Sequence, residues 1–234
     1  NNPTGRVMSK EELLQIADLA RENPNINILS DEIYELILKK EFKHYSLSSL
    51  ANDLKDRIFI INGFAKGWAM TGWRIGYLVG PKDVIKASSA LQSQSTSNVC
   101  SFVQKGALEA LKINNEFFSM INSHYDQRRR LLYEGLKNIN GIYIEEPNGA
   151  FYAFPKLPNS SITSVDFCNK ALQDYGLVVV PGKAFGADQC IRISCAASDI
   201  KIKDGLKRLK KAKTHQTSLK TAFKNVFKTP SRTP

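Results

Sequence analysis

One lysine and one arginine in this sequence have surroundings and a spacing that favour chemistry. Lys66 lies in the run Asn-Gly-Phe-Ala-Lys-Gly-Trp, and Arg74 follows it by eight residues. A lysine held among small and apolar residues gives up its proton more readily than a free one, and the resulting amine is the nucleophile of Schiff-base chemistry. The planar guanidinium of an arginine is suited to a phosphate. The spacing alone decides little, because a surface lysine beside a loop arginine is common.

Other polar residues occupy positions where ligands are often bound. Asn2 begins Asn-Pro-Thr-Gly, which is a turn by composition. Asp31 follows a short strand predicted over 26–30, and Tyr34 comes three residues later. The carboxyl end of a strand in an α/β pattern is a usual place for a ligand, although an acid there also often caps a helix.

Three strands and their connecting helices would position these side chains. Ser9 and Glu12 have the spacing of a capping box, so a helix is predicted from there to the Asn-Pro pair at 23–24. A fully buried strand is predicted over 57–61, just before Lys66, and another strand over 75–80. Strands that alternate with helices favour a mostly parallel sheet and an α/β domain.

The rest of the chain is predicted to be helical and then α+β. Helices over 81–111 are interrupted by a polar run, and a long amphipathic helix over 117–139 carries the basic triplet 128–130 as a solvated face. Short strands at 142–144, 150–154, 178–180 and 190–194 flank one helix at 164–175. We expect a first domain that ends with an interdomain helix, a small C-terminal domain and a loosely ordered basic tail, over residues 1–105, 106–212 and 213–234.

Charge and composition restrict the possible partners. The net charge is +11, but residues 201–234 hold eleven Lys or Arg against the single acid Asp204, so residues 1–200 are close to neutral. The basic balance therefore belongs to the tail and predicts no nucleic-acid binding by the body. If the tail is helical, Leu219, Phe223, Val226 and Phe227 share one face, as in a membrane-surface or partner helix.

The sequence predicts a globular protein of a reducing compartment. It is 42% hydrophobic and 24% charged, without an apolar run of the ~18 residues that a membrane helix needs. Its first residues are no signal peptide. The cysteines at positions 100, 168, 190 and 195 have no metal-ligand spacing, so we expect small buried thiols, no bound metal and a cytoplasmic location.

The run Lys-x3-Met-Thr-Gly-Trp-Arg-Ile-Gly-Tyr, beginning at Lys66, resembles the cofactor-lysine segment of the class I/II aminotransferases, enzymes that use pyridoxal 5′-phosphate (PLP). Asn-Pro-Thr-Gly, followed by Asp-x2-Tyr and then by this run, is similar to the order of motifs in the fold-type-I members. The resemblance covers roughly residues 1–211, and the stretch 92–110 looks most like the bacterial aspartate aminotransferase branch. It implies an α/β fold, the later part of a PLP-binding large domain, followed by a small α+β domain.

The resemblance also implies a role for each candidate residue. Lys66 would carry PLP as a Schiff base and move the proton of the substrate Cα, and Asp31 would keep the pyridine nitrogen protonated. Tyr34 and Asn2 would hydrogen-bond the phenolic oxygen of the cofactor, and Asn2 would also lie against the substrate. Arg74 would bind the phosphate. In the second half, Arg192 would grip the α-carboxylate of the substrate.

The implied function is transamination between an amino acid and a 2-keto acid, with aspartate and 2-oxoglutarate as the expected pair and a homodimer as the expected full-length assembly. Two alternatives stay open: another PLP chemistry on the same scaffold, such as that of a β-lyase or an aminocyclopropane-carboxylate synthase, and a truncated, non-catalytic chain. Family members have a long segment before Asn-Pro-Thr-Gly that this sequence lacks. We expect that segment to supply an interior strand of the large sheet, one that lies between strands present here.

Overall fold

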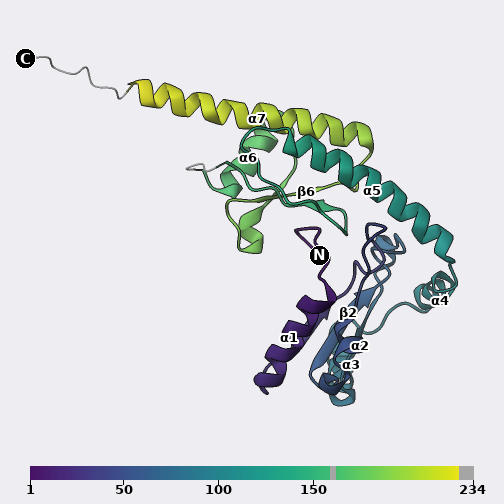
Figure 1. The fold of residues 1–234 in the computed structure, drawn as a ribbon. Coiled ribbons are helices and arrows are strands. Elements are labelled where there is room, and N and C mark those ends of the chain that lie inside the picture. Colours follow the sequence, from purple (N-terminus) through teal and green to yellow (C-terminus); the bar gives the residue numbers. More distant parts are fainter. Residues whose placement is uncertain (159–161, 227–234) are drawn as a thin grey trace, which may run out of the picture. The chain divides into compact units, whose positions relative to one another are not determined.

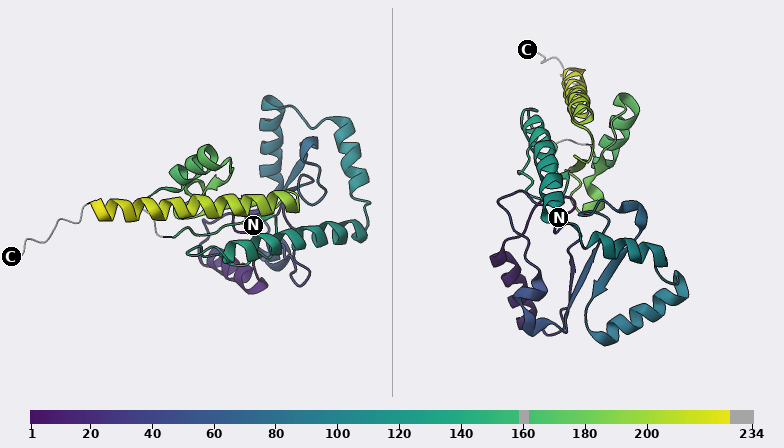
Figure 2. Two further views of the ribbon diagram at one scale, coloured as in Figure 1. Left: turned by 90° about the horizontal axis from the view of Figure 1, so that it is seen from above. Right: turned by 90° about the vertical axis from the view of Figure 1, so that its right-hand side faces the viewer.

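The computed structural model describes residues 1–158 and 162–226, with side chains as far as Ala212, and divides them into two compact units (Figure 1). The first unit contains Asn1, Arg6–His124 and Asn148–Ala150. The second contains Asn2–Gly5, Tyr125–Pro147 and the described residues from Phe151 onward. The division falls inside helix α5 (Asn115–Lys137), whereas the sequence predicts a boundary near residue 105. α5 is one continuous helix across this division (Figure 2).

The first helix is the one that its sequence predicts. α1 spans Lys10–Glu22, and its N-cap Ser9 forms the complete capping box with Glu12. Each residue of this box satisfies a backbone N–H that the start of a helix leaves without an intrahelical partner. The apolar side of α1 packs on the sheet of the first unit through a cluster of small and aliphatic residues: Ala17, Ala20, Leu47, Ala51, Leu54 and Ile58.

The sheet of the first unit has three strands in the order β1-β2-β3, namely Ile28–Asp31, Ile58–Gly63 and Gly76–Val79. β1 and β2 are parallel, as the sequence predicts, but β2 and β3 are antiparallel. The loop of twelve residues that joins β2 to β3 contains a 3₁₀ turn and no α-helix, whereas parallel neighbours are usually joined by a helical crossover. Because all three strands are hydrogen-bonded neighbours, the expectation of a missing strand between them is wrong.

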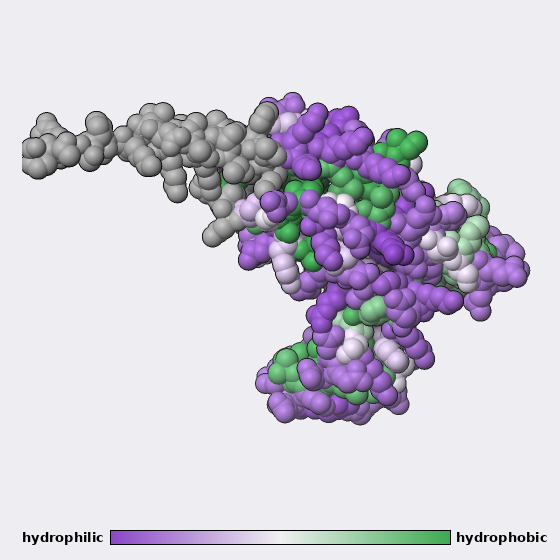
Figure 3. Space-filling model, turned by 45° about the horizontal axis from the view of Figure 1, so that its top comes forward, coloured by the Kyte–Doolittle hydropathy of each residue, from purple (hydrophilic) through white to green (hydrophobic). Residues whose placement is uncertain are grey.

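The prediction that the strand over 57–61 is fully buried is also wrong. Ile58 is 3% exposed and faces the α1 cluster, but Ile61 is 40% exposed. Ile61 lies on the opposite side of the sheet, together with Leu29, which is 63% exposed. Successive strand residues point to opposite faces, and among the described residues α1 and the short helix α2 (Leu47–Leu50) cover only one of them. Figure 3 shows apolar residues, in green, reaching the surface of the molecule.

The remaining helices of the first unit follow the strands. A 3₁₀ turn at Asn52–Leu54 leads into β2, and another at Thr71–Trp73 precedes β3. α3 (Lys82–Ser95) and α4 (Ser101–Ala110) are separated at the predicted polar break. A small cluster of Phe64, Ala107 and Ala110, with Trp68, Met70 and Ile75 packed around it, fixes the loop after β2 against α4.

The second unit has the predicted α+β character. α6 spans Ser164–Tyr175 and packs with α7 (Asp199–Val226) on a three-stranded sheet ordered β4-β6-β5, or Tyr152–Ala153, Ile191–Ser194 and Val180–Pro181. A 3₁₀ turn at Gly182–Phe185 follows β5. The strand predicted at 142–144 is only an isolated bridge from Tyr143 to Lys156. Buried residues from α5, α6, α7 and β6, among them Leu136, Phe167, Ile191 and Leu209, form one core.

Two predictions about single side chains are wrong. Arg129 of the basic triplet is 3% exposed and pairs with Asp126, because its position on α5 is on the buried face with Leu132 and Leu136. Cys100 is exposed, whereas the other three cysteines are buried as expected, and all four are free thiols.

The C-terminal part of the chain is formed by helix α7 and the basic tail. α7 continues the chain to Val226, and the side chains of the predicted tail face, Leu219, Phe223, Val226 and Phe227, lie outside the described part, as do residues 227–234. The loose order expected for the tail therefore stays a prediction. Within the part of the chain that the structure describes, every helix is too short or too polar to cross a lipid bilayer.

Candidate functional site

Lys66 lies on a loop that is held by hydrogen bonds within the loop and by a hydrogen bond to helix α4. β2 ends at Gly63, and the loop closes through backbone bonds from Met70 N to Phe64 O (3.1 Å) and from Ala69 N to Lys66 O (3.1 Å). Trp68 Nε1 donates to Ala110 O of α4 at 3.1 Å. The loop therefore holds the half-buried Lys66 in a defined place, as a reacting amine requires.

The loop of Lys66 lies against the turn that follows β1. A Cβ on Gly67 would come within 2.8 Å of the Leu36 side chain, so only glycine allows this approach. Lys66 Nζ lies 6.0 Å from the centre of the Tyr34 ring. The structure thus brings together the predicted amine and the predicted phenol, which the sequence separates by 32 residues.

Asp31 is the last residue of β1 and pairs in register with Ile61 of β2. Its Oδ1 accepts a hydrogen bond from Ile33 N at 3.2 Å, which begins the turn to Tyr34. Asp31 and Tyr34 line the same cavity of about 130 Å³. The carboxyl ends of the parallel strands therefore present an acid, a phenol and an amine in one region, which agrees with the rule for ligand sites in open α/β sheets.

Arg74 stands at the end of the 3₁₀ turn before β3, in the left-handed conformation with φ 53°. Its Nη1 donates to Thr71 O at 2.9 Å, and the residue is exposed. Residues other than glycine rarely adopt this conformation, which costs roughly 1–2 kcal/mol and concentrates at functional sites. The strain agrees with a functional position for this guanidinium.

Arg192 and Asn2 meet in the second unit. Arg192 lies in β6, the central strand of its sheet, and its Nη1 donates to Asn2 Oδ1 at 2.7 Å. Its guanidinium carbon is 4.7 Å from the centre of the Tyr152 ring and 5.2 Å from that of Phe185. The bond and the rings keep a planar, half-buried cation in one orientation, which is what recognition of a carboxylate needs.

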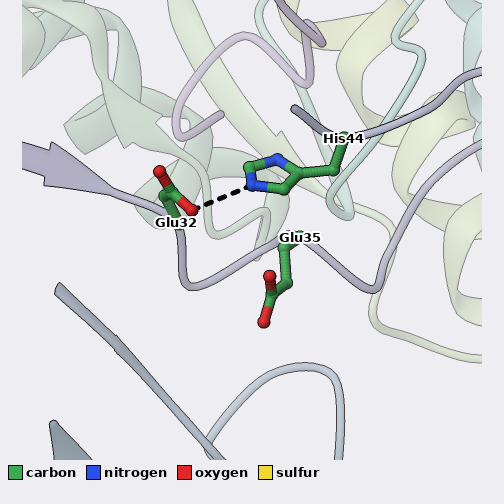
Figure 4. Close-up of side chains that lie close together, drawn as sticks. All are labelled: Glu32, Glu35 and His44. Carbon is green, nitrogen blue, oxygen red and sulfur yellow. Dashed lines mark hydrogen bonds and ion pairs between the residues drawn. The ribbon is translucent and has the colours of Figure 1, made fainter. Parts of the chain in front are cut away.

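A cluster of Glu32, Glu35 and His44 lies beside Asp31 and Tyr34 in the first unit and was not among the predicted site residues (Figure 4). Glu32 is 6% exposed, and its Oε2 lies 3.0 Å from His44 Nε2. Burial opposes ionisation of Glu32, but hydrogen bonds from His44, Ser46 and Ser30 and the charge of His44 outweigh it and hold the pKa of Glu32 below its ordinary value. A glutamate directly after a predicted site acid was the only available signal, and its histidine partner lies twelve residues away on an irregular segment.

The same cluster contains the atoms of a possible metal site among the described residues. Glu32, Glu35 and His44 offer three ligand atoms within 4.8 Å of one another. Both carboxylate oxygens of Glu32, however, already accept hydrogen bonds from neighbouring side chains. The hydrogen-bond network explains the cluster without an ion.

Comparisons with known proteins agree with this geometry. The family described as "Aminotransferase class I and II" matches residues 1–209. The "Probable aspartate/prephenate aminotransferase" of Rickettsia typhi is 42% identical over 224 residues, a match that covers 91% of this chain and 56% of the relative. The "Aspartate aminotransferase" of Pyrococcus horikoshii is 39% identical over 216 residues, covering 91% and 54%. The chain therefore spans about half the length of these curated relatives.

Solved structures give the same result. An aromatic aminotransferase from Pyrococcus horikoshii OT3 matches with a TM-score of 0.85 at 33% identity, over 92% of this chain and 58% of that one. Aspartate aminotransferase from Thermus thermophilus with maleate matches with a TM-score of 0.82 at 39% identity, over 91% of this chain and 55% of that one. The α/β fold followed by an α+β part is thus the fold expected from the sequence.

Proposed function

The chain belongs to the class I and II aminotransferases, and we propose on this basis that its complete protein transfers an amino group between an amino acid and a 2-keto acid, with PLP as cofactor. The family is PLP-dependent, and the residues present fit this cofactor. The observation that carries the proposal is the meeting of Asp31, Tyr34 and Lys66 at the ends of β1 and β2.

The fit rests on the chemistry of the donor set. When bound, PLP supplies an aldehyde that takes up the amino group and a ring that accepts electrons from the substrate Cα. Lys66 offers an amine on a fixed, half-buried loop near the Tyr34 ring. Asp31 offers a carboxylate for a pyridine nitrogen, and the exposed Arg74 offers a guanidinium for a phosphate.

Each side chain then has a distinct task. Lys66 Nζ would hold PLP, and as a free amine it would serve as the general base for the proton at the substrate Cα. The Asp31 carboxylate would keep a proton at the pyridine nitrogen, and the Tyr34 hydroxyl would donate to the phenolic oxygen. Arg192, oriented by Asn2 and two aromatic rings, binds the substrate α-carboxylate.

Aspartate and 2-oxoglutarate are the proposed substrates. Relatives from Rickettsia typhi and Pyrococcus horikoshii are named as aspartate aminotransferases, the former also for prephenate. These names favour transamination over a β-lyase or an aminocyclopropane-carboxylate synthase. A homodimer and a cytoplasmic location complete the proposal and rest on the family resemblance and on composition.

The test is a transamination assay of the complete protein with PLP, aspartate and 2-oxoglutarate, in which oxaloacetate is reduced by a coupled, NADH-dependent dehydrogenase. We expect turnover that Lys66→Ala abolishes. The matched control is Lys55→Ala, an exposed lysine of the same unit, which should keep full activity. Equal loss in both variants, or undiminished turnover by Lys66→Ala, would contradict the assignment of Lys66.

A further inference from the structure

The turn after β1 carries two interleaved pairs of side chains, each with a three-residue spacing. Asp31 and Tyr34 form the first pair, which is proposed above to contact PLP. Glu32 and Glu35 form the second, and hydrogen bonds tie both of them to neighbouring segments. The proposed function uses only the first pair, so the second needs its own explanation.

Glu32 joins the end of β1 to the segment before α2. Its Oε1 accepts from Ser46 Oγ at 3.0 Å and from Ser30 Oγ at 3.1 Å, and its Oε2 lies 3.0 Å from His44 Nε2. An ionised carboxylate only accepts hydrogen bonds, so His44 Nε2 must carry the proton of that contact. Burial of a carboxylate is costly unless its oxygens are satisfied, and this network satisfies both of them.

Glu35 joins the other end of the turn to β2. Asn62, which is 4% exposed, donates through its Nδ2 to Glu35 Oε1 at 2.7 Å. The Oδ1 of Asn62 accepts a hydrogen bond from Gly63 N at 2.7 Å. Asn62 lies four residues before Lys66, so this bond connects the turn to the strand that delivers the lysine.

The backbone of the turn is fixed at the same places. Glu32 N donates to Ile61 O of β2 at 2.9 Å, and Glu35 N donates to Glu32 O at 2.9 Å. We propose that Glu32 and His44 are positioning residues, whose pairing locks this turn so that Asp31 and Tyr34 face the cofactor. This inference rests on the proposed function. It assigns Glu32 of the second pair, together with His44, to support and the first pair to contact.

A positioning role differs from a purely structural one in what a substitution changes. Loss of support should loosen Asp31 and Tyr34 and so weaken PLP binding. It should also shift the pH at which the visible absorption of bound PLP changes, because these two side chains set the charge around the cofactor. Residues that orient the ligands of a bound metal typically change its affinity by about 10–100-fold, and we take the same range for PLP.

The experiment uses the complete protein and compares Glu32→Gln, His44→Gln and the double variant. The matched control is Asp188→Asn, which removes a carboxylate of similar role in the second unit. Asp188 accepts from Ser164 N at 2.9 Å and from Ser164 Oγ at 2.6 Å at the start of α6. For each protein, PLP titration gives a Kd, a pH series gives the absorption midpoint, and thermal unfolding gives a Tm.

We expect each single variant to raise the PLP Kd about tenfold, the lower end of that range, and to shift the absorption midpoint. The PLP Kd of the double variant should not exceed the higher of the two single-variant Kd values, because both substitutions break the same contact. Asp188→Asn should lower Tm and leave Kd and the midpoint unchanged. Network variants that lower Tm while keeping Kd and midpoint would overturn the inference.

Three further results also decide between these roles. If Glu32→Gln does not fold, Ser46→Ala removes a single donor to the same carboxylate, and an unchanged Kd in both Ser46→Ala and His44→Gln would overturn the inference. A wild-type protein that binds no PLP would overturn the proposed function itself, together with this inference. A wild type that binds PLP, beside network variants that bind it equally well, would overturn the inference alone.

Discussion

Substitution of Arg192 by lysine separates the charge of this residue from its geometry. Arginine presents a planar fork that binds a carboxylate through two parallel hydrogen bonds, whereas lysine keeps only a point charge. In the structure the fork is held by the 2.7 Å bond to Asn2 and by the rings of Tyr152 and Phe185, 4.7 Å and 5.2 Å away. A lysine ammonium at this position would keep the attraction for an α-carboxylate and lose the two-point contact.

The expected loss follows from the contacts removed. One charge-assisted hydrogen bond is worth about 1.5–3 kcal/mol, and loss of the bond to Asn2 frees the side chain further. We expect the variant to lose about 3 kcal/mol of transition-state stabilisation, so that kcat/KM falls on the order of 100-fold. Because every amino-acid substrate has an α-carboxylate, the loss should be similar for aspartate, glutamate and an aromatic amino acid.

The assay is steady-state transamination by the complete protein with each of these three amino acids. The matched control is Arg208→Lys, since Arg208 is also in the second unit but donates to Tyr175 O and Asp204 instead of facing a substrate. Arg208→Lys should leave kcat/KM within a factor of about two. A change of preference among the amino acids, with little overall loss, would place Arg192 at the substrate side chain and refute the reasoning.

Two further predictions concern the scaffold. Gly63→Ala should lower Tm and the yield of folded protein, because its Cβ would come within 2.7 Å of Gly76 Cα where β2 and β3 pair, whereas Gly72→Ala, with nothing within 4 Å, should be tolerated; equal thermal melts would contradict this. Burial raises the pKa of the Cys195 thiol to about 11, so iodoacetamide at pH 8 should modify the exposed Cys100 and leave Cys195 intact, as peptide mass spectrometry would show. The native state binds the proton of the Cys195 thiol more tightly than the unfolded state does. The free energy of unfolding should therefore decline as the pH rises from about 9 to 11. An unfolding free energy that stays constant over this pH range would count against the burial of Cys195.

Site residues and local elements could be predicted from the sequence where one motif carries several constraints together, and the roles of the site residues stay predictions. Lys66 and Arg74 lie in a run of specific residues, and Asp31 ends a strand with the turn signal of Tyr34 after it. The capping box of α1 and the bounds of α6 were predicted because caps and periodicity are local properties of the chain. Family resemblance supplied the roles, and the structure then placed Tyr34 beside the lysine.

The sequence was insufficient where burial depends on what covers a residue. The run of apolar residues at 58–61 predicts a fully buried strand. Ile61 is nevertheless exposed, because none of the described residues packs over its face of the sheet. Arg129 reads as solvated within a basic triplet, although its spacing to Leu132 and Leu136 is that of one helix face and would have shown its burial. The pairing of Glu32 with His44 is a tertiary contact that no local pattern encodes.

The central claim is that Lys66 is the residue that carries the cofactor. Borohydride fixes PLP covalently to the amine that holds it, so the complete protein can be incubated with PLP, reduced, digested and analysed by peptide mass spectrometry. We expect the added mass on the peptide containing Lys66, at close to one cofactor per chain, and no modification when Lys66→Ala is treated in the same way. Label spread over several exposed lysines, or the same label on the Lys66→Ala protein, would contradict it.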